Sequence, residues 1–145
     1  MTLHAWARHG TLARRIQCLV VATDRAGSPH IGLDAGVLAG VGPTNVLLGS
    51  DPASLFSDCD VVIDFSAPEA SLQHALLAAE TGTAIVIGTT GLNAEQEAVL
   101  RHAATQTAIV YCANTSVGVT LLTQLVEQVA AQLTSGWDIE ILETH

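Results

Sequence analysis

Val86-Ile87-Gly88-Thr89-Thr90-Gly91-Leu92 joins an apolar segment to a polar turn that contains two glycines. Asn93 follows and precedes a helix-forming stretch, so the pattern predicts a buried strand, a tight loop and an asparagine-capped helix. In an open α/β sheet, ligands bind just beyond the carboxyl ends of the strands. Glycines let a ligand approach the backbone closely, and threonines supply hydroxyl and N–H groups. We therefore expect a ligand-binding loop here.

The same order of strand, loop and helix recurs along the chain. Strands are predicted over residues 18–22, 60–65, 83–87, 107–111 and 138–143. Helices are predicted as a short turn from Asp51, from a Ser66-x-x-Glu69 capping box to Gly82, over residues 94–104, and from Val117 to Gly136. Alternating strands and helices with short connections predict right-handed crossovers. We expect an α/β fold with a doubly wound, mostly parallel sheet.

Two further expectations concern the ends of the chain. Residues 1–17 contain one glycine, Gly10, and no predicted strand, and residues 5–16 suit a helix. Near the other end, the helix from Val117 carries one apolar face. The residues of that face are Leu122, Leu125, Val126, Val129 and Leu133.

Composition excludes several classes of protein. The net charge of −9 disfavours nucleic-acid binding, which needs a basic surface. No apolar run reaches the roughly 18–20 residues that span a bilayer, and the first residues lack a secretory signal. Cys18, Cys59 and Cys112 are widely spaced, which argues against a disulfide framework or a zinc site and fits a reducing compartment. We expect a cytoplasmic protein that acts on a small molecule.

Asp24 and Arg25 follow the first predicted strand. A carboxylate at this position can accept hydrogen bonds from a ribose, and a guanidinium can bind a 2′-phosphate. The pair would therefore accommodate both NADH and NADPH, although an ordinary surface ion pair would look the same in sequence. The glycine-rich turn that should precede such an acidic residue by about 20 residues is absent.

Asn114, Thr115 and Ser116 lie between a predicted strand and a predicted helix. An asparagine there can bind a carboxamide through both of its polar groups, and Thr115 or Ser116 would equally serve as a helix N-cap. Cys112 is better explained as a small packed residue than as a nucleophile, because no cationic residue is near it in sequence.

The histidines show no metal-ligand spacing, so no metal site is predicted. His4, His9, His30, His74 and His102 are interpreted as surface or structural residues. Asp58, Asp60 and Asp64 are interpreted as a solvated edge. His145 follows a predicted strand, where an acid or base could face a substrate.

Six segments carry a family resemblance, in order along the chain. They are Ala22-Thr23-Asp24-Arg25, Gly32-Leu33-Asp34-Ala35-Gly36, Val62-Ile63-Asp64-Phe65-Ser66-Ala67-Pro68-Glu69, Ile87-Gly88-Thr89-Thr90-Gly91, Ala113-Asn114-Thr115-Ser116-Val117-Gly118-Val119 and Ile139-Glu140-Ile141-Leu142-Glu143-Thr144-His145. Together they resemble the 4-hydroxy-tetrahydrodipicolinate reductases (dihydrodipicolinate reductases) of the diaminopimelate and lysine pathway.

The resemblance implies NADH- or NADPH-dependent reduction of 4-hydroxy-tetrahydrodipicolinate, a cyclic dicarboxylate, to tetrahydrodipicolinate. It places Asp24 and Arg25 at the adenosine ribose and its 2′-phosphate. Further implied cofactor contacts are Gly88, Thr89, Thr90, Cys112, Ala113, Asn114 and Thr115. His145 matches the first histidine of the family's His-His-x-x-x-Lys segment, the proposed proton donor or acceptor. The full-length family enzyme is a homotetramer.

The resemblance also implies a division of the chain. Residues 1–116 would form a Rossmann-like dinucleotide-binding domain without its first strand and glycine loop. Residues 117–145 would begin a second α+β domain for substrate binding and tetramer formation. The chain has no Gly-x-x-Gly-Arg-Met-Gly loop and ends before the second histidine, the lysine and the Asp-Ala-Pro-Ser-Gly loop, so we expect negligible reductase activity from it alone.

Two other interpretations remain open from the sequence. A non-catalytic α/β interaction module would show no reductase turnover even with flanking sequence restored. A nicotinamide-dependent dehydrogenase of another pathway would lack the His-His-x-x-x-Lys continuation.

Overall fold

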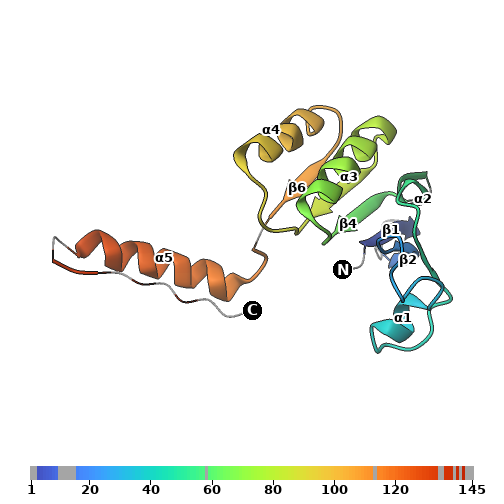
Figure 1. The fold of residues 1–145 in the computed structure, drawn as a ribbon, viewed down its shortest axis with the longest axis horizontal. Helices are drawn as coiled ribbons and strands as arrows, with labels where there is room; N and C mark the ends of the chain where they lie inside the picture. Colours follow the sequence, from blue (N-terminus) through green and yellow to red (C-terminus); the bar gives the residue numbers. More distant parts are fainter. Residues whose placement is uncertain are drawn as a thin grey trace. The chain divides into compact units, whose positions relative to one another are not determined.

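The computed structural model divides the chain into two compact units, Met1–Ala113 and Asn114–His145 (Figure 1). The residues that it describes are 3–9, 16–57, 59–112, 114–133, 136–138, 140 and 142. Of the expected site residues, Ala113 and His145 lie outside this described part.

The first unit is built on a six-stranded sheet with the strand order β3-β2-β1-β4-β5-β6. The strands are β1 (Leu3–His9), β2 (Ile16–Thr23), β3 (Leu48–Gly49), β4 (Val61–Asp64), β5 (Ala84–Ile87) and β6 (Ile109–Tyr111). The helices are α1 (Ala35–Leu38), α2 (Ala53–Ser57), α3 (Pro68–Thr81) and α4 (Ala94–Ala103). Five of the strands run in one direction, which confirms the predicted α/β fold with a mostly parallel sheet.

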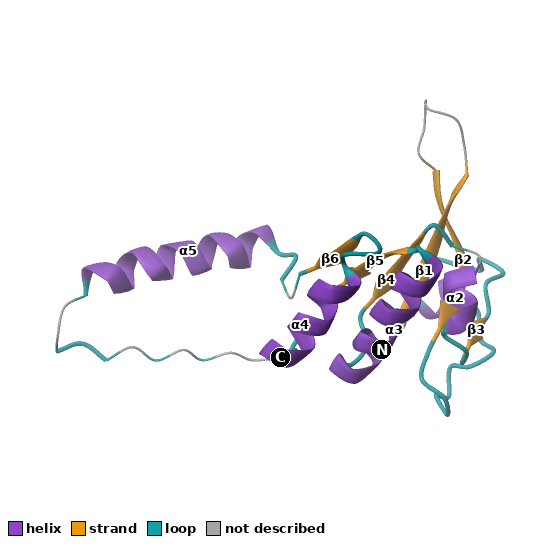
Figure 2. Cartoon of the chain, turned by 90° about the horizontal axis from the view of Figure 1, so that it is seen from above, coloured by secondary structure: helices purple, strands orange, loops and turns teal. Residues whose placement is uncertain are grey.

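β1 corrects the prediction for the start of the chain. Residues 5–16 were expected to be helical, with no strand before residue 18, but β1 lies at the centre of the sheet and pairs antiparallel with β2 and β4. Without β1 the facing edges of β2 and β4 would carry unpaired N–H and C=O groups, and β1 satisfies both edges. Leu3 lies opposite Thr23, so the start of β1 is at the carboxyl ends of its neighbours. Figure 2 shows β1 between β2 and β4.

The main core lies between the sheet and the helices α2, α3 and α4. Val62, Ile85 and Ile87 of β4 and β5 are almost completely buried. Ala75 and Ala78 of α3 are fully buried, and their small side chains let this helix approach the strands closely. The packing of α3 on β4 and β5 fixes the position of the residues that follow β4.

The helix boundaries confirm some predicted caps and correct another. Asn93 and Gln96 form a reciprocal capping box at the start of α4, and Gly82 ends α3 at a φ of 74°. The predicted capping box between Ser66 and Glu69 is wrong. Pro68 occupies the first turn of α3, so the N-cap is Ala67. The Ser66 N–H instead donates to the Thr89 hydroxyl oxygen.

The second unit contains the predicted longer helix, α5 (Val117–Gln132), capped by Ser116. No residue of α5 is buried, and its apolar residues Leu122, Leu125, Val126 and Val129 are each more than 40% exposed. The predicted strand over residues 138–143 is not seen at its described residues, which are Asp138, Glu140 and Leu142.

Within the described part of the chain, every helix is too short or too polar to span a membrane.

Candidate functional site

A cavity of about 470 Å³ lies at the carboxyl ends of β2 and β4. Its volume is within the range of small-molecule sites. The segment after β2, the segment after β3 and the first turns of α3 form its walls. The lining residues are Thr23, Asp24, Arg25, Ala26, Ser50, Pro52, Ser66, Ala67, Ala70, Gln73, His74 and Leu77. This is the sheet edge at which an open α/β fold binds ligands.

Asp24 is a buried, ionised acceptor in the wall of this cavity. Only 8% of the residue is exposed, and its N–H donates to the carbonyl of Gly49 at 3.0 Å. Its carboxylate accepts the Ser28 hydroxyl at 2.7 Å and the Arg25 N–H at 2.8 Å. Burial acts to raise the pKa of Asp24, but interactions that favour the charged form, first among them these two hydrogen bonds, hold the pKa below its ordinary value. The carboxylate is therefore charged at neutral pH.

Arg25 lies beside Asp24 in the cavity wall and is itself exposed. It contacts Asp24 through its backbone N–H. The two residues that were predicted to hold a ribose and a 2′-phosphate therefore both line this cavity.

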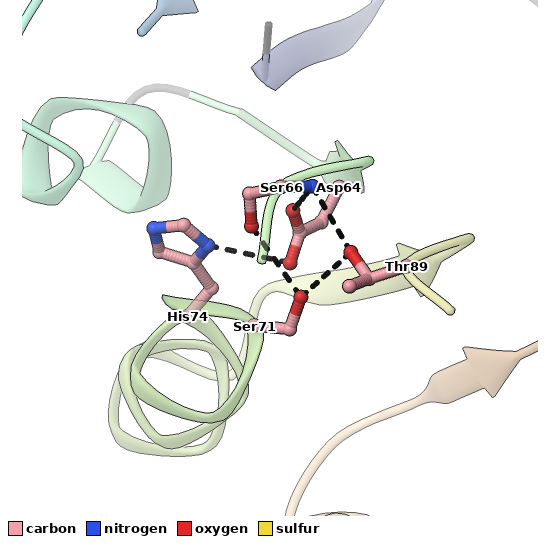
Figure 3. A network of polar contacts seen from close by, with 5 residues as sticks. All are labelled: Asp64, Ser66, Ser71, His74 and Thr89. Carbon is pink, nitrogen blue, oxygen red and sulfur yellow. Dashed lines mark hydrogen bonds and ion pairs between the residues drawn. The ribbon is translucent and has the colours of Figure 1, made fainter. Parts of the chain in front are cut away.

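A second cluster, the Asp64 network, adjoins the cavity at the end of β4 (Figure 3). Its members are Asp64, Ser66, Ser71, His74 and Thr89. Asp64 is completely buried; one of its oxygens accepts the Ser66 N–H at 2.9 Å, and the other is hydrogen-bonded to Nδ1 of His74 at 3.3 Å. Burial alone would raise the pKa of Asp64, but hydrogen bonds from His74, Ser66 and Ser71 keep the pKa below its ordinary value.

The Asp64 network continues from β4 to the loop after β5. The Thr89 hydroxyl oxygen accepts the Ser66 N–H at 3.0 Å and the Ser71 hydroxyl at 2.8 Å. Thr89 is 2% exposed, so its side chain stabilises the loop from inside the protein. A ligand at this loop would meet the backbone of Gly88 and Thr89 and the exposed residue Thr90.

Gly88 permits a close contact in the same loop. A Cβ atom at this position would overlap the ring of Phe65, which packs against the glycine. The Gly88 N–H donates to the carbonyl of Asp64 at 2.8 Å, so the backbone of the loop is fixed to the end of β4. The requirement for glycine is therefore steric.

The remaining expected cofactor residues lie after β6. Cys112 is half-buried, and its N–H donates to the carbonyl of Ile87 at 3.0 Å. Asn114 and Thr115 belong to the second unit. The Asn114 side chain accepts the Ser116 N–H at 2.9 Å, and the Ser116 hydroxyl accepts the Val119 N–H at 3.3 Å. This segment therefore caps α5, with Ser116 as the N-cap.

The interpretation of Asp64 as part of a solvated edge is wrong, because Asp64 is completely buried and pairs with His74. His74, interpreted as a surface or structural residue, is buried in this pair and also lines the cavity, which the sequence reasoning did not foresee. A usable signal was present: Asp64 ends an apolar strand, and Ser71 and His74 are three residues apart on one face of the next helix.

Among the described residues, no three potential metal ligands lie close enough together to form a metal site.

Comparison with known proteins identifies the family. The model of the family "Dihydrodipicolinate reductase, N-terminus" matches residues 11–115. A 4-hydroxy-tetrahydrodipicolinate reductase of Acinetobacter baumannii is 47% identical over 127 residues, which are 88% of this chain and 46% of that protein. The corresponding enzyme of Chelativorans is 45% identical over 141 residues, covering 93% of this chain and 51% of the relative.

A third relative, the 4-hydroxy-tetrahydrodipicolinate reductase of Burkholderia multivorans, is 48% identical over 127 residues, covering 88% of this chain and 48% of the relative. The chain thus spans about half the length of the curated relatives that it matches. On the family match and these identities, the chain belongs to the dihydrodipicolinate reductase family.

Proposed function

We propose that this chain supplies the NADH- or NADPH-binding part of a 4-hydroxy-tetrahydrodipicolinate reductase. The observation that carries the proposal is the cavity of about 470 Å³ with the ionised Asp24 and the exposed Arg25 in its wall. The names of the relatives supply the substrate, 4-hydroxy-tetrahydrodipicolinate, and its reduction. The family resemblance implies that the product is tetrahydrodipicolinate.

The cavity fits the adenosine end of such a cofactor. Asp24 offers a charged acceptor for ribose hydroxyls, and Arg25 offers a guanidinium for a 2′-phosphate. Ala67, Ala70 and Leu77 add apolar surface for a base. When bound, the nicotinamide supplies the hydride. The protein's part is to orient the cofactor and to keep water from the reacting atoms.

The other end of the cofactor would meet the loop of Gly88, Thr89 and Thr90. Cys112, Ala113, Asn114 and Thr115 are proposed as further contacts. His145 is the proposed proton donor or acceptor toward the cyclic dicarboxylate substrate. These roles rest on the family resemblance.

We assign residues 1–116 to the dinucleotide-binding domain and residues 117–145 to the start of the substrate domain. The boundary between the two compact units, at residues 113 and 114, supports a division close to this point. Location in the cytoplasm and assembly of the complete enzyme as a homotetramer are part of the same proposal.

Binding measurements on the 145-residue chain test the proposal. We expect NADH and NADPH to bind in isothermal titration calorimetry, with negligible turnover of 4-hydroxy-tetrahydrodipicolinate. Arg25→Gln should weaken NADPH binding about 10- to 150-fold and leave NADH binding nearly unchanged, because a charge-assisted hydrogen bond contributes about 1.5–3 kcal/mol.

Arg101→Gln is the matched control. Arg101 is an exposed residue of α4 that pairs with Glu97, and its loss changes the net charge equally. Equal effects of the two substitutions, or equal losses for NADH and NADPH, would contradict the assignment of Arg25. Absence of dinucleotide binding would instead favour a non-catalytic interaction module.

A further inference from the structure

His74 is held by one edge of its ring. It lines the cavity, is 6% exposed, and its Nδ1 lies 3.3 Å from an oxygen of the fully buried Asp64. An ionised carboxylate only accepts hydrogen bonds, so Nδ1 must carry the proton of this contact. In the neutral ring Nε2 is then an acceptor. In Figure 3 the second ring nitrogen lies on the side of the ring away from Asp64.

The second oxygen of Asp64 fixes the orientation of the carboxylate relative to His74. It accepts the backbone N–H of Ser66 at 2.9 Å, a donor that cannot change its role. The Thr89 hydroxyl oxygen also accepts this N–H at 3.0 Å, and it accepts the Ser71 hydroxyl at 2.8 Å, so the N–H is bonded to the loop after β5. Asp64 therefore presents one oxygen to a fixed donor and the other to His74.

We propose that Asp64 is a positioning residue that sets the tautomer of His74, so that Nε2 is a hydrogen-bond acceptor in the cavity wall and the cavity prefers a base with an exocyclic amino group to one with a carbonyl. This inference rests on the proposed function, because it deepens the assignment of the cavity to a purine nucleotide. Adenosine nucleotides carry such an amino group, whereas inosine nucleotides carry a carbonyl at the same place.

Asp64→Asn provides a sharp test. The asparagine must keep its oxygen toward the Ser66 N–H, because two donors would otherwise face each other. Its NH₂ group would then face Nδ1 of His74 and donate to it. The proton of the ring would move to Nε2, and the polarity that His74 offers to the cavity would reverse.

The experiment uses the 145-residue chain with AMP and IMP as probes, at alkaline pH where free imidazole is neutral. ¹⁵N NMR of the His74 ring reports the tautomer independently of any ligand. We expect the wild-type chain to be protonated at Nδ1 and to bind AMP about tenfold more tightly than IMP, the size of effect expected when one hydrogen bond is lost. Asp64→Asn should move the proton to Nε2 and abolish or reverse this preference.

Ser71→Ala is the matched control, since it removes a buried hydroxyl that bonds Thr89 and contributes to the hydrogen bonding of Asp64, and it leaves the contact between Asp64 and His74 in place. Its ratio of AMP to IMP affinity should remain that of the wild type. If Asp64→Asn does not fold, His74→Gln gives a second test, because a glutamine amide can accept or donate and should bring the ratio close to one.

The outcomes separate this inference from the proposed function. An unchanged tautomer in Asp64→Asn, or an unchanged ratio of affinities, overturns the inference even if NADPH binds as proposed. Conversely, a ratio that follows the tautomer in a chain without affinity for NADH or NADPH supports the purine site and contradicts the dinucleotide-binding function. A chain that binds NADH or NADPH but neither AMP nor IMP contradicts the inference alone, and a chain that binds none of the four nucleotides contradicts both.

Discussion

Replacement of Gly88 by alanine should destabilise the first unit through a single identifiable clash. The new Cβ would overlap the ring of Phe65, and the Gly88 backbone cannot move away easily because its N–H is bonded to the carbonyl of Asp64 at 2.8 Å. The ring must therefore leave its position. Phe65 is 39% exposed, so more than half of its surface would lose its contacts.

The magnitude follows from this partial burial. Full burial of a phenylalanine side chain contributes about 1.5–3 kcal/mol, so displacement of the half-buried Phe65 should cost about 1–2 kcal/mol. For a unit of this size the corresponding decrease in Tm is about 4–8 °C per kcal/mol. Urea denaturation followed by circular dichroism measures the free energy of unfolding directly.

A double-mutant cycle isolates the contact. Phe65→Ala removes the ring, so adding Gly88→Ala to that variant should cost less than about 0.5 kcal/mol. If Gly88→Ala is equally destabilising with and without the ring, the steric explanation is incorrect, and the loop would need glycine for another reason. Ile87→Val, a substitution in the core one residue earlier, serves as a control. Its cost in the free energy of unfolding should be the same with and without Phe65→Ala.

The remaining predictions concern buried polar groups and a cap. Asp64→Ala should reduce the free energy of unfolding by about 1–3 kcal/mol at neutral pH, because the buried His74 Nδ1 loses its acceptor and the Ser66 N–H keeps only the Thr89 hydroxyl oxygen. Since the pKa of Asp64 is lowered in the folded state, its contribution is complete above the unfolded pKa of about 4 and is lost as the pH falls through the folded pKa. Urea titrations at several acidic pH values should therefore show a weaker pH dependence for Asp64→Ala than for the wild type, and parallel curves would refute this. Asn93→Ala should cost about 1 kcal/mol through loss of the capping box of α4, and a cost below about 0.3 kcal/mol would show that the cap is dispensable.

The sequence was a good guide wherever structure depends on neighbours along the chain. The strand and loop around Gly88, the Asn93 cap and the position of Asp24 after a strand all follow from local patterns, and the structure confirms them. Family resemblance then added the expected substrate and reaction, which no local pattern could supply.

Most of the errors arose where distant segments decide the outcome, and the error at Ser66 had a local cause. The antiparallel place of β1 depends on the open edges of β2 and β4, which are separated from each other by more than 35 residues of chain. The burial of Asp64 depends on α3, which covers the end of β4 and brings His74 to it. At Ser66 the local capping signature was correct in spacing, but Pro68 fixed the start of the helix one residue later.

The central position of β1 has a consequence for cooperativity. Within the sheet, this one strand joins a half made of β3 and β2 to a half made of β4, β5 and β6. The cavity takes Asp24 and Arg25 from the first half and Ser66 and His74 from the second. Opening of β1 would separate the two walls, so a ligand that contacts both walls stabilises β1 by mass action. Nucleotide binding and slow hydrogen exchange of the β1 amides are thereby two measures of a single equilibrium.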